Sequence, residues 1–197
     1  MKNFKSVLFV AAFTATLSAQ CSRWNPQTDF PPAQQLVEFL SQKDVLTSEP
    51  ECAAVALELL GHEHAQEHIS EIVKFLTFRR KFYWEGTGFN IRPVGEIDHY
   101  PAATALVEIG KPALPALLSV VAEGPPDSLK FRNAVNTIML IHREEPPAAV
   151  RLLRRAVVRE TDTMRSTNLN AAVAMADSFC SKETRDACIA AAHESLQ

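Results

Sequence analysis

Four arginines between positions 151 and 159 are spaced so that they share one side of a helix. Arg151, Arg154, Arg155 and Arg159 fall at positions i, i+3, i+4 and i+8, opposite an apolar stripe of Val150, Leu153, Ala156 and Val157. Guanidinium groups bind carboxylates and phosphates through paired hydrogen bonds. The pattern therefore indicates either a binding surface for an acidic partner or an ordinary solvated helix face.

A second group combines histidines with a carboxylate at the spacing of a metal site. The run His64-Ala65-Gln66-Glu67-His68 matches the H-x-x-E-H pattern of inverzincin metallopeptidases. On one helix, His64 and His68 would lie a turn apart and share a zinc ion, with Glu67 as the base. Those enzymes are typically large α/β proteins with a further acidic ligand, which this sequence does not suggest. Metal binding without catalysis and solvated turn residues are the alternatives.

The cysteines point to a disulfide near the C-terminus. Cys180 and Cys188 are eight residues apart, which is about 12 Å along a continuous helix and too far for a disulfide. A turn at Ser181, a good N-cap residue, would bring the two together. We therefore predict a Cys180–Cys188 disulfide, and we expect Cys52, which lies among apolar residues, to be packed rather than nucleophilic.

The first twenty residues have the layout of a secretory signal peptide. Lys2 and Lys5 precede a mostly apolar, uncharged run over 7–17, which is shorter than the about 20 residues that span a bilayer. We therefore predict that residues 1–20 are a signal peptide and that the protein is exported, periplasmic or secreted, in a bacterium. A first core helix is the alternative.

Cys21 raises the question of a lipid anchor. The segment 17–21 resembles a bacterial lipobox, in which a small residue precedes an acylated cysteine, but Gln20 departs from that pattern. An exported product without a lipid is preferred. Contact with a membrane is expected only if Cys21 is lipidated.

The rest of the chain is predicted to be helical, with few strand signals. We divide it into an N-terminal segment, 21–48, with an extended lead-in and a short helix, and a helical domain, 49–197. The apolar periodicity predicts helices over 33–42, 49–60, 64–78, 100–109, 112–123, 129–141, 146–160, 167–179 and 182–195. Gly61 and Gly110 are expected to end helices, and the residues from Ser48 to Glu51 match a capping box.

Four of these helices contain a similar alanine-rich run. The runs start at Ala53, Ala102, Ala134 and Ala171, at spacings of 49, 32 and 37 residues. The segment 102–118, with its Ile109-Gly110 stop followed by Pro112-Ala113 and a Leu117-Leu118 end, closely resembles a HEAT repeat. The resemblance covers about residues 49–195. It implies an all-α fold, a short α-solenoid of antiparallel helix pairs, and a scaffold that binds other proteins through its second helices without shared catalytic residues.

The longest spacing contains an insertion at 79–99. It places Tyr83, Trp84 and Phe89 close to glycines and basic residues. Aromatic and β-branched residues around glycines favour a β-hairpin, and Trp, Tyr and Arg are enriched at binding hot spots. The aromatic side chains therefore either contact a partner or pack against the neighbouring helices.

Composition limits these interpretations. With 197 residues, 47% of them hydrophobic and 22% charged, the chain is long and apolar enough to fold around a core. A net charge of −3 argues against general nucleic-acid binding. We therefore predict a scaffold for another protein or peptide, which is not an enzyme and needs no cofactor. The alternatives are a metal-binding protein or metal-dependent hydrolase that uses His64, Glu67 and His68, and a structural component of the cell envelope.

Overall fold

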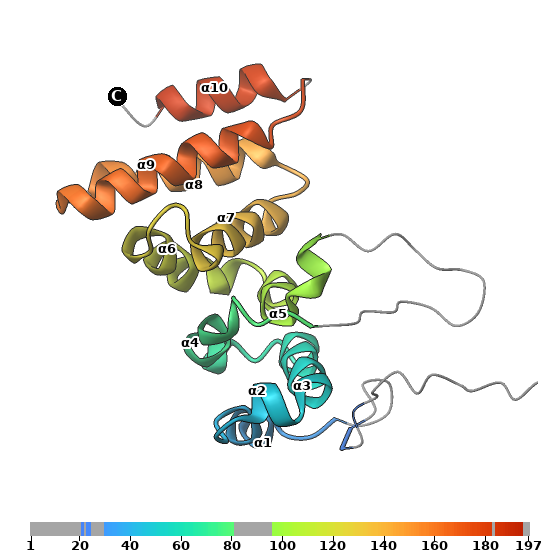
Figure 1. The fold of residues 1–197 in the computed structure, drawn as a ribbon. Coiled ribbons are helices and arrows are strands. Elements are labelled where there is room, and N and C mark those ends of the chain that lie inside the picture. The colour runs from blue at the N-terminus through green and yellow to red at the C-terminus, as the bar shows by residue number, and fades with distance from the viewer. Residues whose placement is uncertain (1–20, 22, 25–29, 81–95, 183, 195–197) are drawn as a thin grey trace, which may run out of the picture.

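The computed structural model of the chain is built from helices (Figure 1). It describes residues 21, 23–24, 30–80, 96–182 and 184–194, and no β-strand occurs among them. This confirms the predicted all-α class. The α-helices are α1 (Ala33–Leu40), α2 (Val45–Ser48), α3 (Pro50–His62), α4 (Ile69–Ile72), α5 (Pro101–Ile109), α6 (Leu114–Glu123), α7 (Leu129–Ile141), α8 (Pro146–Arg159), α9 (Thr163–Ser178) and α10 (Arg185–Glu194). Short 3-10 helices are η1 (Gln66–His68), η2 (Val73–Phe75), η3 (Glu96–His99) and η4 (Lys111–Ala113).

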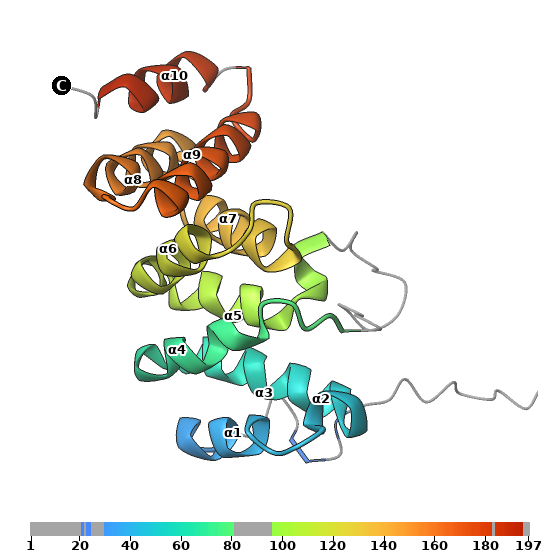
Figure 2. The ribbon, with the colours of Figure 1, turned by 60° about the vertical axis from the view of Figure 1, so that its left-hand side comes forward.

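The helices are stacked from α1 at one end to α10 at the other (Figure 1 and Figure 2). The helices that carry the alanine-rich runs, α3, α5, α7 and α9, contact one another in succession. Helix α6 contacts α7 and α9, and α8 contacts α9 and α10. Each helix therefore covers an apolar face of its neighbours, and one continuous core runs from Leu36 to Ala191.

Small side chains allow the stacked helices to approach closely. The fully buried alanines of α3, α5, α7 and α9 include Ala53, Ala56, Ala102, Ala105, Ala134, Ala172 and Ala176. Larger side chains fill the space between the helices, and Leu57, Leu106, Ile138 and Leu153 have no exposed surface. The alanine-rich pattern in the sequence thus corresponds to the contacts between successive helices.

Two buried amides tie the ends of helices to their neighbours. Asn133 Nδ2 donates to the carbonyl oxygen of Leu76 at 2.7 Å, and Asn168 Nδ2 donates to that of Ala122 at 2.8 Å. The last carbonyl groups of a helix have no partner within it. The two asparagines satisfy such groups in the interior, and in this way fix α7 to the end of η2 and α9 to the end of α6.

The boundaries of α7 and the end of α5 are where the sequence predicts them, whereas α9 starts earlier. Helix α7 spans the expected 129–141, and Ser128 Oγ accepts a hydrogen bond from the Phe131 amide at 3.2 Å. Helix α5 ends before Gly110, whose φ of 79° is a conformation that favours glycine. Helix α9 begins at Thr163, four residues before the predicted start, because Asp162 Oδ1 caps it by accepting from the Arg165 amide at 2.8 Å.

The prediction that Gly61 ends a helix is wrong. Helix α3 continues through Gly61 to His62. A Cβ atom added to Gly61 would lie 2.7 Å from Ala105 Cα and 2.7 Å from Glu108 Oε2. This glycine is therefore needed for the close approach of α3 and α5 rather than for a turn.

The segment after α3 is also less regular than predicted. In place of one helix over 64–78, a turn with His64 at φ 48° precedes η1, α4 and η2. The amides of His64 and Ala65 donate to the carbonyls of Gly61 and Leu60, which closes the turn and stops a helix from starting at His64.

The predicted capping box at Ser48 is wrong as well. Ser48 ends α2, and its Oγ donates to the carbonyl of Asp44 at 3.0 Å instead of accepting from α3. Helix α3 begins at Pro50 without a side-chain cap. Proline suits this first position because its missing N–H would have no partner in the helix.

The predicted disulfide near the C-terminus is present in the structure. Cys180 and Cys188 are bonded, with Cα atoms 6.6 Å apart. The turn that brings them together has the Thr184 amide donating to Ser181 Oγ at 3.3 Å. Helix α10 then starts at Arg185, three residues after the predicted start, and the disulfide fixes it to the end of α9.

Candidate protein-binding surface

The four arginines predicted to share one side of a helix all lie on α8, but they divide into two pairs. Arg151 binds Glu145, and Arg154 Nη1 donates to Asn170 Oδ1 of α9 at 3.2 Å. These two side chains hold α8 to its own surroundings. Two of the four arginines of the predicted stripe therefore already have partners within the chain.

The other two arginines are exposed. Within the part of the chain that the structure describes, Arg155 and Arg159 form no hydrogen bond or ion pair. Val158 is 54% exposed, and positions 155, 158 and 159 share a helix face at i, i+3 and i+4 spacing. We call Arg155, Val158 and Arg159 the α8 patch. It combines two cations with an apolar side chain.

A pocket of about 240 Å³ adjoins the α8 patch. It lies between α6, α8 and α9, and its lining residues are Pro115, Leu118, Ser119, Ala122, Ala156, Arg159, Glu160, Arg165 and Leu169. Its lining combines apolar side chains with the charged side chains of Arg159, Glu160 and Arg165. The pocket has room for a small apolar side chain next to Arg159.

The lining of this pocket includes a second arginine, Arg165, which already has acidic partners. Arg165 Nε donates to Glu160 Oε2 at 2.8 Å, and its Nη1 lies 3.3 Å from Glu123 Oε1. The pKa of Glu160 is held below its usual value, mainly by the hydrogen bond from Arg165. Among the pocket-lining residues that are described, Arg159 is therefore the cation left for an added carboxylate.

The histidine cluster does not have the geometry predicted for it. His64 is exposed in the left-handed turn, and His68 ends η1, so the two do not lie one turn apart on an α-helix. His68 Nε2 is 3.9 Å from Glu67 Oε1. No group of three or more histidine, cysteine or acidic side chains that could hold a metal ion occurs among the described residues.

His62 lies beside a carboxylate that the sequence did not single out. Its Nδ1 is 3.3 Å from Glu108 Oε2 of α5. Burial raises the pKa of Glu108, and the positive charge of protonated His62 opposes that shift. The contact joins α3 to α5 at the point where Gly61 allows them to approach.

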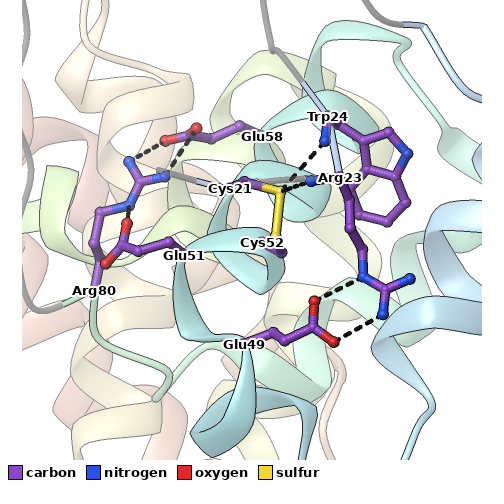
Figure 3. The surroundings of a disulfide bond; sticks show 8 residues. All are labelled: Cys21, Arg23, Trp24, Glu49, Glu51, Cys52, Glu58 and Arg80. Carbon is purple, nitrogen blue, oxygen red and sulfur yellow. Dashed lines mark hydrogen bonds and ion pairs between the residues drawn. A yellow bond between two sulfur atoms is a disulfide. The ribbon is translucent and has the colours of Figure 1, made fainter. Parts of the chain in front are cut away.

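The aromatic residues of the insertion, Tyr83, Trp84 and Phe89, lie outside the described residues, as does the predicted hairpin. The two described ends of the insertion are joined, because the Arg80 amide donates to the His99 carbonyl oxygen at 2.8 Å. The Arg80 side chain is buried against α3 and forms paired bonds of 2.7 and 3.2 Å with Glu58 (Figure 3). Arg80 therefore anchors the insertion instead of presenting a charge to a partner.

Sequence reasoning missed a second disulfide, between Cys21 and Cys52 (Figure 3). Their Cα atoms are 4.5 Å apart, and the bond joins the N-terminal segment to the first turn of α3. The even number of cysteines in a chain predicted to be exported was the available signal. The local patterns point elsewhere, because the segment before Cys21 resembles a lipobox and the neighbours of Cys52 are apolar.

Comparison with protein-family models, with curated proteins and with solved structures finds no significant match for this chain. The described helices also contain no single one that is long and apolar enough to cross a membrane. Residues Pro101–Ile109 and Lys111–Glu123 pass that test as a pair, but they are bent by 115° relative to each other.

Proposed function

We propose that this chain is an exported, HEAT-like repeat protein that binds an acidic peptide segment of another protein. The observation that carries the proposal is the α8 patch, where two exposed arginines without partners in the described chain flank an exposed valine beside a pocket. Guanidinium groups bind carboxylates with two parallel hydrogen bonds. The matching ligand is a peptide with acidic side chains next to an apolar one.

The order of helix contacts supports the repeat interpretation. Helices α3, α5, α7 and α9 contact one another in succession, as the first helices of HEAT-like pairs would in a short α-solenoid. Helix α8 is then a second helix, which is the kind that such proteins use for binding. The insertion, with Tyr83, Trp84 and Phe89 on a proposed hairpin, is a second contact proposed from the sequence alone.

The two disulfides support the export part of the proposal. Disulfides persist in oxidising compartments and are rare where thiols are kept reduced. Together with the leader-like residues 1–20, they fit a periplasmic or secreted protein.

A selection from a random peptide library tests the ligand class. The folded protein is immobilised, and bound peptides are sequenced after washing at low and at moderate salt. We expect enriched peptides to carry aspartate or glutamate next to a small apolar residue, and we expect salt to weaken their binding. Enrichment of peptides without acidic residues, or no enrichment above a blank surface, would contradict the proposal.

A further inference from the structure

We propose that Cys21 forms a disulfide with Cys52 of α3 and is not the attachment point of a lipid. We call this Cys21–Cys52 disulfide the clasp. Acylation of a lipobox cysteine and disulfide formation both use the same Sγ atom, so one excludes the other. In the structure this atom is bonded to Cys52 Sγ. The inference concerns the N-terminal segment and rests only on the export part of the proposed function, not on peptide binding.

The surroundings of Cys21 favour the disulfide. Cys52 is 4% exposed on the first turn of α3. The amides of Arg23 and Trp24 each lie 3.4 Å from Cys21 Sγ and donate to it (Figure 3). The backbone thus turns around the sulfur and directs it towards α3.

The residues that follow Cys21 are docked on the folded domain. Arg23 forms hydrogen bonds of 2.7 and 2.9 Å with both carboxylate oxygens of Glu49. The Trp24 ring packs edge-on against Phe39 of α1, with the ring centroids 4.8 Å apart. A lipid on Cys21 would have to enter a membrane while the chain three residues later is packed in this way. No length of chain remains between the two that would act as a tether.

The clasp forms by thiol–disulfide exchange, in which the two thiols are oxidised. The thiols of Cys21 and Cys52 lose two protons and two electrons as the S–S bond forms. A protein disulfide of the oxidising compartment accepts them and is reduced to a dithiol. The step therefore requires that Cys21 reaches that compartment as a free thiol.

The test is peptide mapping by mass spectrometry of the full-length chain, expressed with its own leader and alkylated before unfolding without a reductant. We expect the peptides that contain Cys21 and Cys52 to be crosslinked, and no incorporation of a fatty acid supplied to the cells as an alkyne analogue. In Cys52→Ser, we expect Cys21 to be alkylated completely. In Cys188→Ser, the matched control, we expect the Cys21–Cys52 crosslink to persist.

One further variant is designed to favour acylation as far as the sequence allows. Gln20→Ala with Cys52→Ser restores a small residue before Cys21 and removes its disulfide partner, so this variant is the one most open to lipid attachment. A wild-type chain with acylated Cys21, a mature chain that lacks Cys21, or free thiols at both positions after removal of the leader would each overturn the clasp. Retention of the leader with all cysteines reduced would instead overturn export itself.

Discussion

At the scale of single residues, the ion pairs of the buried Arg80 side chain hold the start of the insertion against α3. Arg80 is 8% exposed and lies between Glu58 and Glu51, with its Nε 3.4 Å from Glu51 Oε2. Burial raises the pKa of Glu51, and the charge of Arg80 opposes that shift. Removing one member of such a cluster leaves the others buried and uncompensated, which costs more than an exposed pair would.

Replacing Arg80 with methionine is expected to lower the free energy of unfolding by about 3 kcal/mol at pH 7. The loss should be smaller at pH 4, because Glu51 takes up a proton more readily once the cation, which lowers its pKa, is absent. Urea unfolding at the two pH values measures both quantities. Arg132→Met, at an exposed position of α7, should change stability little. An Arg80→Met variant as stable as this control at pH 7 would show that the cluster does not hold the segment.

Glu108 gives a second prediction at this scale, about pH. Its pKa is raised in the folded protein, chiefly by burial, so folding favours the protonated carboxyl. The stability that this contributes is present below the unfolded pKa of about 4.3 and is lost as the pH rises through the folded pKa. Glu108→Gln should therefore be more stable than the wild type at pH 7.5, with the difference shrinking towards pH 4.

Thermal unfolding at both pH values checks the Glu108 prediction. Glu63→Gln, an exposed position just after α3, removes the same charge and serves as the control. A Glu108→Gln variant that is less stable than the wild type at pH 7.5 would mean that the contact with His62 outweighs the cost of burial.

At the scale of elements, two glycines that look alike in the sequence have different roles. Gly110 ends α5 with a positive φ, whereas Gly61 lies inside α3 against Ala105. Both follow an apolar run, so the local pattern predicts a helix end at each. The difference at Gly61 depends on a helix 40 residues further along the chain, which local periodicity does not report. For the same reason the sequence predicts most helix ends well, but not the contacts between helices.

Gly61→Ala is expected to destabilise the protein by about 1–3 kcal/mol, the usual cost of overpacking. In an unconstrained helix the same change would be stabilising, by up to about 1 kcal/mol. The added Cβ would be 2.7 Å from the Ala105 backbone, so α3 and α5 would have to move apart. Chemical denaturation measures the sign, with Ser70→Ala, an exposed position of α4, as a baseline. A gain in stability at Gly61 would contradict the close approach.

At the scale of the whole molecule, the candidate surface is only partly visible in the sequence. Helical spacing places Arg151, Arg154, Arg155 and Arg159 on α8 correctly. It does not reveal that Asn170 of α9 and Glu145 occupy two of them, because these partners depend on the stacking of helices and on the turn before α8. The pocket beside Arg159 likewise arises from three helices together. Because the net charge of the chain is −3, the proposed attraction of an acidic ligand depends on this local patch rather than on the charge of the whole chain.

The most direct test of the account is the affinity of one enriched acidic peptide for three forms of the protein, measured by isothermal titration calorimetry. Arg155→Glu/Arg159→Glu reverses both charges of the α8 patch. Lys43→Glu/Arg132→Glu makes the same change in net charge at exposed sites in the turn between α1 and α2 and on α7. We predict that the first variant binds at least about tenfold more weakly than the wild type, equal to about 1.4 kcal/mol, and that the second binds within about twofold. Equal weakening in both variants, or none in the first, would contradict the account.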